Sequence, residues 1–109
     1  MNIGYLYALT NRAFDNSLIK IGHTTKEPNI RAKEISSNTG VPEPFDIAFA
    51  FKVYDCKEAE TIIHKKLKAY RNNNKREFFI MTIDVARELI LKICRVFRIE
   101  YASVASDTV

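Results

Sequence analysis

The start of the chain holds two short apolar runs separated by a polar turn, and this pattern constrains the fold more than any other feature. Ile3–Leu9 and Leu18–Ile21 are rich in β-branched, aromatic and aliphatic residues, and residues 10–17 between them are mostly turn-forming. Two such runs close together along a chain are typical of antiparallel pairing. We therefore predict that the fold begins with a β-hairpin.

Three helices are expected after the hairpin. Thr24 and Glu27 fit a Ser/Thr-x-x-Glu helix start, which predicts a first helix over about residues 26–36. Asp55 and Glu58 mark a second start, and the helix that follows has one apolar face, made of Ala59, Ile62, Ile63, Leu67 and Tyr70. A third amphipathic helix is predicted from Ile83 to about Phe97. Two more strands are predicted, over 45–53 and 77–81.

These elements predict a single α+β domain, because 109 residues are too few for two independent hydrophobic cores. We expect a ββαβα core with a small three-stranded, mainly antiparallel sheet flanked by helices, followed by a short strand and a C-terminal helix. Residues 1–82 form the core domain in this prediction. Residues 83–102 hold an amphipathic helix that packs on the same domain, and residues 103–109 form a flexible tail.

Composition limits the function without deciding it. Seventeen Lys and Arg against thirteen Asp and Glu give a formal charge of +4, which favours polyanionic partners without requiring them. Cys56 and Cys94 have no second cysteine or histidine at zinc-finger spacing, so both are predicted to be buried free thiols. No leader-like start and no run of 18 apolar residues is present, so we expect a cytoplasmic protein that does not contact a membrane. The motifs of P-loop NTPases, zincins and thiol redox enzymes are also missing.

Residues of the hairpin and of the two helices that follow have a spacing that resembles the GIY-YIG nuclease superfamily over about residues 3–79. Tyr7 stands where the first-strand tyrosine of that superfamily lies. Lys20-Ile21-Gly22 replaces Tyr-Ile-Gly, as is common in a short branch from phages, large DNA viruses and bacteria, so a lysine takes the place of the second signature tyrosine. Arg31 matches the helical arginine and Glu60 the glutamate of the second helix.

This resemblance also implies the outer parts of a site. His23 stands where many members carry a basic or polar active-site residue, and Asn72 matches a polar residue beyond the second helix. Arg76-Glu77-Phe78-Phe79 resembles the closing motif of the short branch. The fold expected on this basis for residues 1–82 is a GIY-YIG-like nuclease domain, located in the host cytoplasm if the protein is viral.

The chemistry implied is hydrolysis of a DNA phosphodiester that leaves a 5′ phosphate and a 3′ hydroxyl. Tyr7 would position or deprotonate the attacking water, for which its pKa would have to be lowered, and Arg31 would bind the non-bridging phosphate oxygens. Glu60 would hold Mg²⁺ or Mn²⁺, since magnesium keeps several waters and needs few protein carboxylates. Lys20 would supply positive charge or take a proton, or else mark an inactive site.

A basic stretch surrounds the end of the second helix. Its members predicted to bind nucleic acid are Lys65, Lys68, Arg71, Asn72, Lys75 and Arg76. A run of charge is also commonly a solvated face. Arg87, Lys92, Arg95 and Arg98 of the third helix extend this surface or only make that helix soluble.

Each site residue also has an ordinary structural explanation. Tyr7 is explained as a half-buried strand tyrosine, and Arg31 as a partner of Glu27 or Glu34 in an exposed helical ion pair worth about 0.3–0.5 kcal/mol. Glu60 and His64 are spaced to pair at i,i+4, and we assign His64 to helix packing, outside the metal shell.

The leading prediction is therefore a divalent-metal-dependent DNA endonuclease with little intrinsic sequence specificity, targeted by a partner protein, by homodimerisation or by recognition of a DNA structure. The alternative is a catalytically inactive module of the same fold that binds nucleic acid or a protein, for example a viral anti-defence factor. A third reading is a plain protein-interaction domain.

Overall fold

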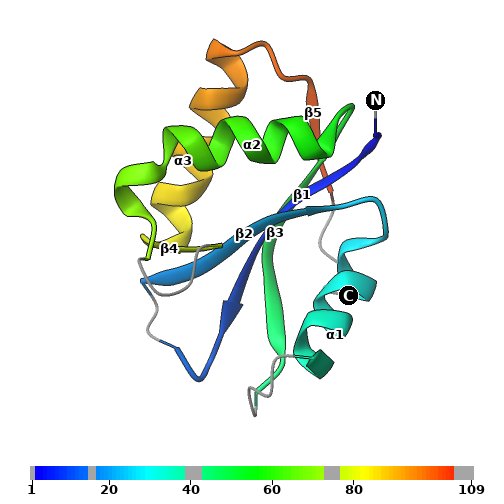
Figure 1. Cartoon of the computed structure of the whole chain (residues 1–109), viewed down its shortest axis with the longest axis vertical. Coiled ribbons are helices and arrows are strands. Elements are labelled where there is room, and N and C mark those ends of the chain that lie inside the picture. Colours follow the sequence, from blue (N-terminus) through cyan, green and yellow to red (C-terminus); the bar gives the residue numbers. More distant parts are fainter. Residues whose placement is uncertain (1, 15–16, 39–42, 73–76, 105–109) are drawn as a thin grey trace.

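The computed structural model describes residues 2–14, 17–38, 43–72 and 77–104. Within these ranges the chain forms a five-stranded antiparallel sheet, with strand order β4-β2-β1-β3-β5, and three α-helices (Figure 1). The elements are β1 (Gly4–Asn11), β2 (Leu18–Thr24), α1 (Pro28–Asn38), β3 (Phe45–Val53), α2 (Cys56–Lys66), the 3₁₀ helix η1 (Lys68–Tyr70), β4 (Phe78–Ile80), α3 (Ile83–Val96) and β5 (Tyr101–Ser103).

The α+β class and the hairpin are confirmed, but the predicted three-stranded sheet is only partly right. β1 pairs with both β2 and β3, and these strands are the predicted centre. β4 then adds to β2 and β5 adds to β3, which widens the sheet to five strands. β5 includes Ser103, which was assigned to a loose tail; its three side chains are all exposed, so no apolar alternation marks it in the sequence. Residues 105–109 lie outside the described part of the chain.

Helices cover both faces of the sheet. Successive residues of a strand point to opposite faces, so β1 turns Leu6 and Ala8 to one side and Tyr7 and Leu9 to the other. Leu6 and Ala8 share a core with residues of α2 and α3, whereas Tyr7 and Leu9 share a smaller core with residues of α1. Figure 1 shows α2 and α3 on one side of the sheet and α1 on the other. A side chain at the edge of β2 therefore lies within reach of helices from both layers.

Helix α2 begins as predicted and ends earlier than its apolar pattern indicates. The Asp55 side chain accepts a hydrogen bond from the backbone N–H of Glu58 at 3.3 Å, an N-cap of the kind worth about 1 kcal/mol. Ala59, Ile63 and Leu67 are buried as expected. Tyr70, however, is 42% exposed, and its predicted place on the apolar face is wrong. The chain tightens into η1 after Leu67, and a 3₁₀ helix has three residues per turn, which rotates Tyr70 out of line.

Cys56 and Cys94 are buried free thiols, as predicted. No helix in the described part of the chain is long and apolar enough to cross a membrane.

An ion pair links the edge strand β4 to β2. The Lys20 ammonium lies 2.9 Å from a carboxylate oxygen of Glu77 and 5.5 Å from the centre of the Phe78 ring. Partial burial opposes ionisation of Glu77, but its hydrogen bond with Lys20 and the positive charges of Lys20, His64 and Arg31 together outweigh that effect and hold the pKa of Glu77 below its ordinary value. The pair therefore contributes stability only while Glu77 is charged.

The stability of the fold should accordingly depend on Glu77 in a pH-dependent way. A carboxyl group whose pKa is lowered by folding stabilises the protein above its unfolded-state pKa of about 4.3 and loses that contribution as the pH falls through its folded-state pKa. We expect Glu77→Gln to lower the free energy of unfolding at pH 7 and to have almost no effect at pH 3, as measured by urea unfolding at both pH values.

Glu88→Gln is the matched control, since Glu88 is an exposed glutamate of α3. It should change the free energy of unfolding little at either pH. A deficit for Glu77→Gln that is equally large at pH 3 would contradict this account of the ion pair.

Candidate functional site

The outer edge of β2 is open along its second half. β4 pairs with β2 only over Leu18–Lys20, and among the described residues no strand pairs with the outer side of Gly22, His23 or Thr24. Residues from both helical layers converge beside this open edge. The predicted site residues lie here.

On the α1 side, Tyr7 reaches the edge by crossing Gly22. Tyr7 of β1 is paired with Gly22 of β2, and its ring lies directly over the glycine. A Cβ atom at residue 22 would lie 2.5 Å from the Tyr7 hydroxyl oxygen, closer than real Cβ atoms approach other atoms. Gly22 is therefore needed for this close approach of a side chain, and it lets a residue that is only 3% exposed bring its hydroxyl group to the edge.

Arg31 of α1 is hydrogen-bonded to that hydroxyl group. A guanidinium group has only donors, so Arg31 donates to the phenol oxygen and leaves the phenolic proton to donate to another acceptor. Arg31 also lies 3.2 Å from Glu34, and its side chain remains 42% exposed. The ion pair expected for a purely structural Arg31 thus exists, together with a second contact that this explanation did not include.

The environment of Tyr7 favours one of its two suggested roles over the other. Burial raises the pKa of Tyr7, and the nearby carboxylates of Glu77 and Glu60 act in the same direction, while Arg31 acts against them without reversing the shift. A lowered pKa, which a base at Tyr7 would need, is therefore not found, because the phenol is well shielded from water, and the shift favours the protonated phenol, a hydrogen-bond donor.

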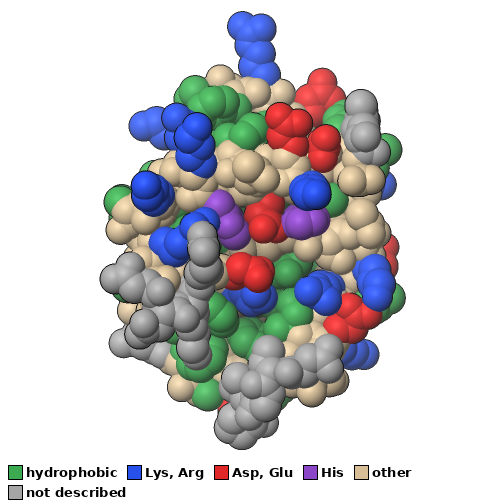
Figure 2. Space-filling view, in the orientation of Figure 1, with side chains coloured by type: hydrophobic (Ala, Val, Ile, Leu, Met, Phe, Trp, Pro, Cys, Tyr) green, Lys and Arg blue, Asp and Glu red, His purple; other side chains and the backbone are tan. Residues whose placement is uncertain are grey.

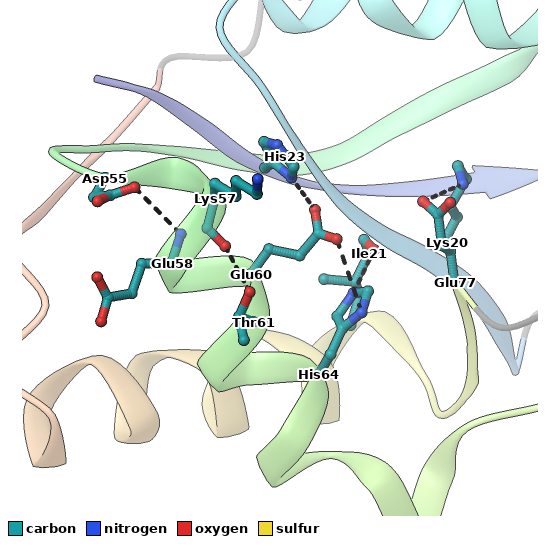
Figure 3. A network of polar contacts seen from close by, with 10 residues as sticks. All are labelled: Lys20, Ile21, His23, Asp55, Lys57, Glu58, Glu60, Thr61, His64 and Glu77. Atoms are coloured by element: carbon teal, nitrogen blue, oxygen red, sulfur yellow. Dashed lines mark hydrogen bonds and ion pairs between the residues drawn. The ribbon is translucent and has the colours of Figure 1, made fainter. Parts of the chain in front are cut away.

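On the α2 side, Glu60 points toward β2 and lies between two histidines (Figure 3). Nδ1 of His23 forms a short hydrogen bond with Oε2 of Glu60, and Nδ1 of His64 lies 3.9 Å from Oε1. A charged carboxylate only accepts hydrogen bonds, so Nδ1 of His23 carries the proton. In the neutral imidazole Nε2 is then the unprotonated nitrogen, on a side chain that is 34% exposed.

The two halves of the site lie close together. Glu60 and Glu77 both act electrostatically on the Tyr7 hydroxyl group, and His64 and Arg31 both act on Glu77. Lys20 joins the group through its ion pair with Glu77 (Figure 3). The structure thus gathers all five predicted catalytic residues, Tyr7, Lys20, His23, Arg31 and Glu60, around the edge of β2. Their chemical roles stay predictions.

The metal-binding capacity of this region is small. Within the described ranges, no three or more His, Cys, Asp and Glu side chains are grouped so that they could hold a metal ion. Oε1 of Glu60 nevertheless lies 3.9 Å from Nδ1 of His64, and the Glu60 side chain is 19% exposed. One accessible carboxylate oxygen fits Mg²⁺ or Mn²⁺ that keeps several waters, and a substrate phosphate would supply a further oxygen.

Basic side chains lie beside the site. Lys65 and Lys68 are exposed, whereas Arg71 and Asn72 are partly buried, and Lys75 and Arg76 lie outside the described residues. Figure 2 shows the histidines and acidic side chains near the centre of one face, with Lys and Arg side chains gathered next to them.

Arg71 differs from the other basic residues because its side chain is held in place and one of its hydrogen-bond donors has no partner in the described structure. Its guanidinium lies 5.5 Å from the centre of the Phe79 ring, and its backbone is bridged to Phe79. Its Nε atom is fully buried, and no hydrogen-bond partner for it is found in the described structure. A buried donor without an acceptor is costly, and because Nε is shielded from solvent, an anionic ligand could meet Arg71 only through the other nitrogens of its guanidinium.

Two features of the site were missed in the sequence. Glu77 appeared only as part of a closing motif, and its contact with Lys20 joins residues 57 positions apart. The role of Gly22 as the platform for Tyr7 depends on the strand register, which no local pattern reveals. For His64 a signal existed, the i,i+4 spacing from Glu60, but it was assigned to helix packing.

A separate cavity of about 520 Å³ lies at the other end of α2. It is lined by Tyr54, Asp55, Glu58, Ala59, Ile62, Phe97, Arg98, Ile99 and Glu100. Three carboxylates against one arginine make this cavity a poor match for a polyanion, and none of the predicted site residues lines it.

Comparison with known proteins corrects the family prediction. Residues 4–94 match the model of the T5orf172 domain, a family different from GIY-YIG, although its fold is related to some nuclease-like domains. The chain shows no significant match to a curated protein or to a solved structure. Membership of the GIY-YIG superfamily was wrong because it depended on a few short motifs, in which a lysine already replaced a signature tyrosine. The match covers most of the chain, and the protein belongs to the T5orf172 domain family.

Proposed function

We propose that this protein is a divalent-metal-dependent endonuclease that hydrolyses phosphodiester bonds in DNA. The observation that carries the proposal is the convergence, at one open strand edge, of the Tyr7–Arg31 pair and the His23–Glu60 pair beside a basic surface. Hydrolysis of a phosphodiester needs an activated water and positive charge on the phosphate oxygens. Each requirement has a matching group in this site.

His23 is the group that would activate water. Glu60 holds Nδ1 of His23 and so leaves Nε2 as the unprotonated nitrogen, which is the arrangement of a histidine base oriented by a carboxylate. In the proposed step, water attacks phosphorus while Nε2 accepts its proton. The bond from phosphorus to the leaving oxygen then breaks, and that oxygen takes a proton from solvent.

Arg31 and Tyr7 would stabilise the charge that develops on the phosphate. The Arg31 guanidinium is always charged and offers a planar set of donors that matches two phosphate oxygens. The Tyr7 hydroxyl group, held by Arg31 and kept protonated, adds a neutral donor at the same place. Both groups are fixed before substrate binds, so little reorganisation is needed in the reaction.

A divalent ion fits beside these groups on Glu60. When bound there with water and a substrate oxygen, Mg²⁺ or Mn²⁺ would supply positive charge for the phosphate and lower the pKa of a bound water. Glu60 would then use Oε1 for the ion and Oε2 for His23. This division fits the distances, since the His23 contact involves Oε2 alone.

DNA as the substrate is supported by the surface beside the site. Lys65, Lys68 and Arg71 follow the site along the end of α2 and η1, where they can contact successive phosphates. Such contacts carry little sequence information, so targeting would come from a protein partner, a homodimer or a DNA structure.

An inactive nucleic-acid-binding module is the second candidate, and the state of Lys20 favours it. Lys20 is tied to Glu77 and stacked beside Phe78, so its ammonium is committed to holding the edge strand and is poorly placed for proton transfer. This module would bind DNA through the same basic surface and leave the DNA intact.

The proposal is tested by incubating the purified protein with linear, single-stranded and branched DNA, with Mg²⁺, Mn²⁺ or EDTA. We expect cleavage that requires the metal ion. Glu60→Ala should lower the cleavage rate by a factor of at least about 100, because it removes both the metal ligand and the carboxylate that orients the His23 base, and Tyr7→Phe by a similar factor for loss of one fixed donor.

Two neighbouring residues serve as matched controls. Glu58→Ala removes an exposed carboxylate from the same helix as Glu60. Tyr5→Phe removes a hydroxyl group from the same strand as Tyr7, one that donates an exposed hydrogen bond to Glu27. Both should cleave at the wild-type rate. Cleavage that survives Glu60→Ala would contradict the site, and binding without cleavage by the wild type would favour the inactive module.

Arg71 should contribute to DNA binding more than its exposed neighbours. Because its guanidinium is already held over the Phe79 ring beside the site, we expect Arg71→Gln to weaken binding and to reduce the slope of log affinity against log salt by about one. Fluorescence anisotropy with a labelled duplex at several salt concentrations measures both quantities.

Arg87→Gln is the control, since the guanidinium of Arg87 on α3 also lies over a phenylalanine, 5.2 Å from the centre of the Phe49 ring. An equal loss for both variants would show that net charge alone governs binding and would refute the assignment of Arg71.

A further inference from the structure

We infer that His64 is a second protein ligand of the divalent ion, so that the metal site is a Glu60–His64 pair on one face of α2. This inference deepens the proposed function and rests on a metal ion being bound at Glu60. It reverses the assignment of His64 to helix packing. The evidence is the way the imidazole is held, not its mere proximity to a carboxylate.

The tautomer of His64 is fixed by the backbone of β2. Its Nε2 lies 2.8 Å from the carbonyl oxygen of Ile21, and a carbonyl only accepts hydrogen bonds, so Nε2 carries a proton. In the neutral imidazole Nδ1 is therefore the unprotonated nitrogen. A histidine that donates one ring N–H to a backbone carbonyl and presents the other nitrogen is the usual arrangement of a metal ligand.

The ring of His64 cannot easily turn away from this position. Its side chain is only 13% exposed, and the ring packs against Phe79, with 5.0 Å between ring centres. Phe79 is fully buried, so it forms a rigid support. The direction of the Nδ1 lone pair is thus set by β2 on one side and β4 on the other.

Nδ1 of His64 faces Oε1 of Glu60 at 3.9 Å. This distance is too long for a hydrogen bond, and in the neutral imidazole both atoms are acceptors, so the gap between them suits a cation. Two adjacent ligands of an octahedral ion, each about 2.1 Å from it, lie about 3.0 Å apart, so Nδ1 and Oε1 would move about 1 Å closer together when the ion binds. The divalent ion would reach its usual coordination number with these two protein ligands, several waters and a substrate oxygen.

The helix holds both ligands in register. Residues four apart lie on the same face of an α-helix, as Glu60 and His64 do, and the buried Ala59 and Ile63 fix how α2 is rotated on the sheet. The other oxygen of Glu60 is bound by His23, which orients the carboxylate. An imidazole ligand also favours ions such as Ni²⁺ or Zn²⁺ over Mg²⁺, which prefers oxygen.

The test is pulsed electron paramagnetic resonance of Mn²⁺ bound to the untagged protein. The chain contains two histidines, so any imidazole nitrogen coupled to Mn²⁺ comes from His23 or His64. We expect nitrogen coupling in the wild type and in His23→Gln, and none in His64→Gln. Calorimetry should show at least a tenfold weaker affinity for Ni²⁺ in His64→Gln than in the wild type.

The outcomes separate this inference from the proposed function. Nitrogen coupling that disappears in His64→Gln supports His64 as a ligand even if the protein fails to cleave DNA. Metal-dependent cleavage without nitrogen coupling, or with coupling that disappears only in His23→Gln, would overturn the inference and leave the nuclease proposal standing. An unchanged Ni²⁺ affinity in a folded His64→Gln would overturn it as well.

Discussion

The pairing of Tyr7 with Gly22 is the contact on which the candidate site depends. A tyrosine in the middle of β1 reaches the edge of the sheet only because the residue opposite it on β2 has no side chain. Shifting the register by one residue would turn Tyr7 to the other face of the sheet and break its contact with Arg31. The hairpin register therefore connects the α1 layer to the edge where Glu60 arrives from the α2 layer.

The second constraint is the rotation of α2 on the sheet. Asp55 fixes where the helix starts, and its buried apolar stripe fixes which face meets β2, so Glu60 and His64 face the sheet edge together. The short strand β4 completes the arrangement, because it supplies Phe79 beneath His64 and Arg71, and the residue just before it, Glu77, lies beside Lys20. A packing core and a charged edge thus share the same elements, and a change to either affects both.

Much of the fold could be predicted from local patterns, while the site could be predicted only in part. Alternation and caps located the hairpin, the start of α2, the strand over 45–53 and α3. They failed for β5, which buries nothing, and for Tyr70, where the helix changes its pitch. Tyr7, Arg31 and Glu60 were selected because they match positions of the GIY-YIG motifs that the chain resembles. Their contacts depend on the register of the strands and on pairings across the sheet, such as Lys20 with Glu77, which no short motif encodes. The short motifs also led to the wrong family.

The central claim is that Arg31 from one helical layer and Glu60 from the other act on the same phosphate. A double-mutant cycle of single-turnover DNA cleavage with Arg31→Gln, Glu60→Gln and the double variant tests it most directly, because groups that act as a unit have strongly non-additive effects. The account predicts that the double variant cleaves about as slowly as the slower single variant. Losses that multiply, as for independent residues, would contradict it.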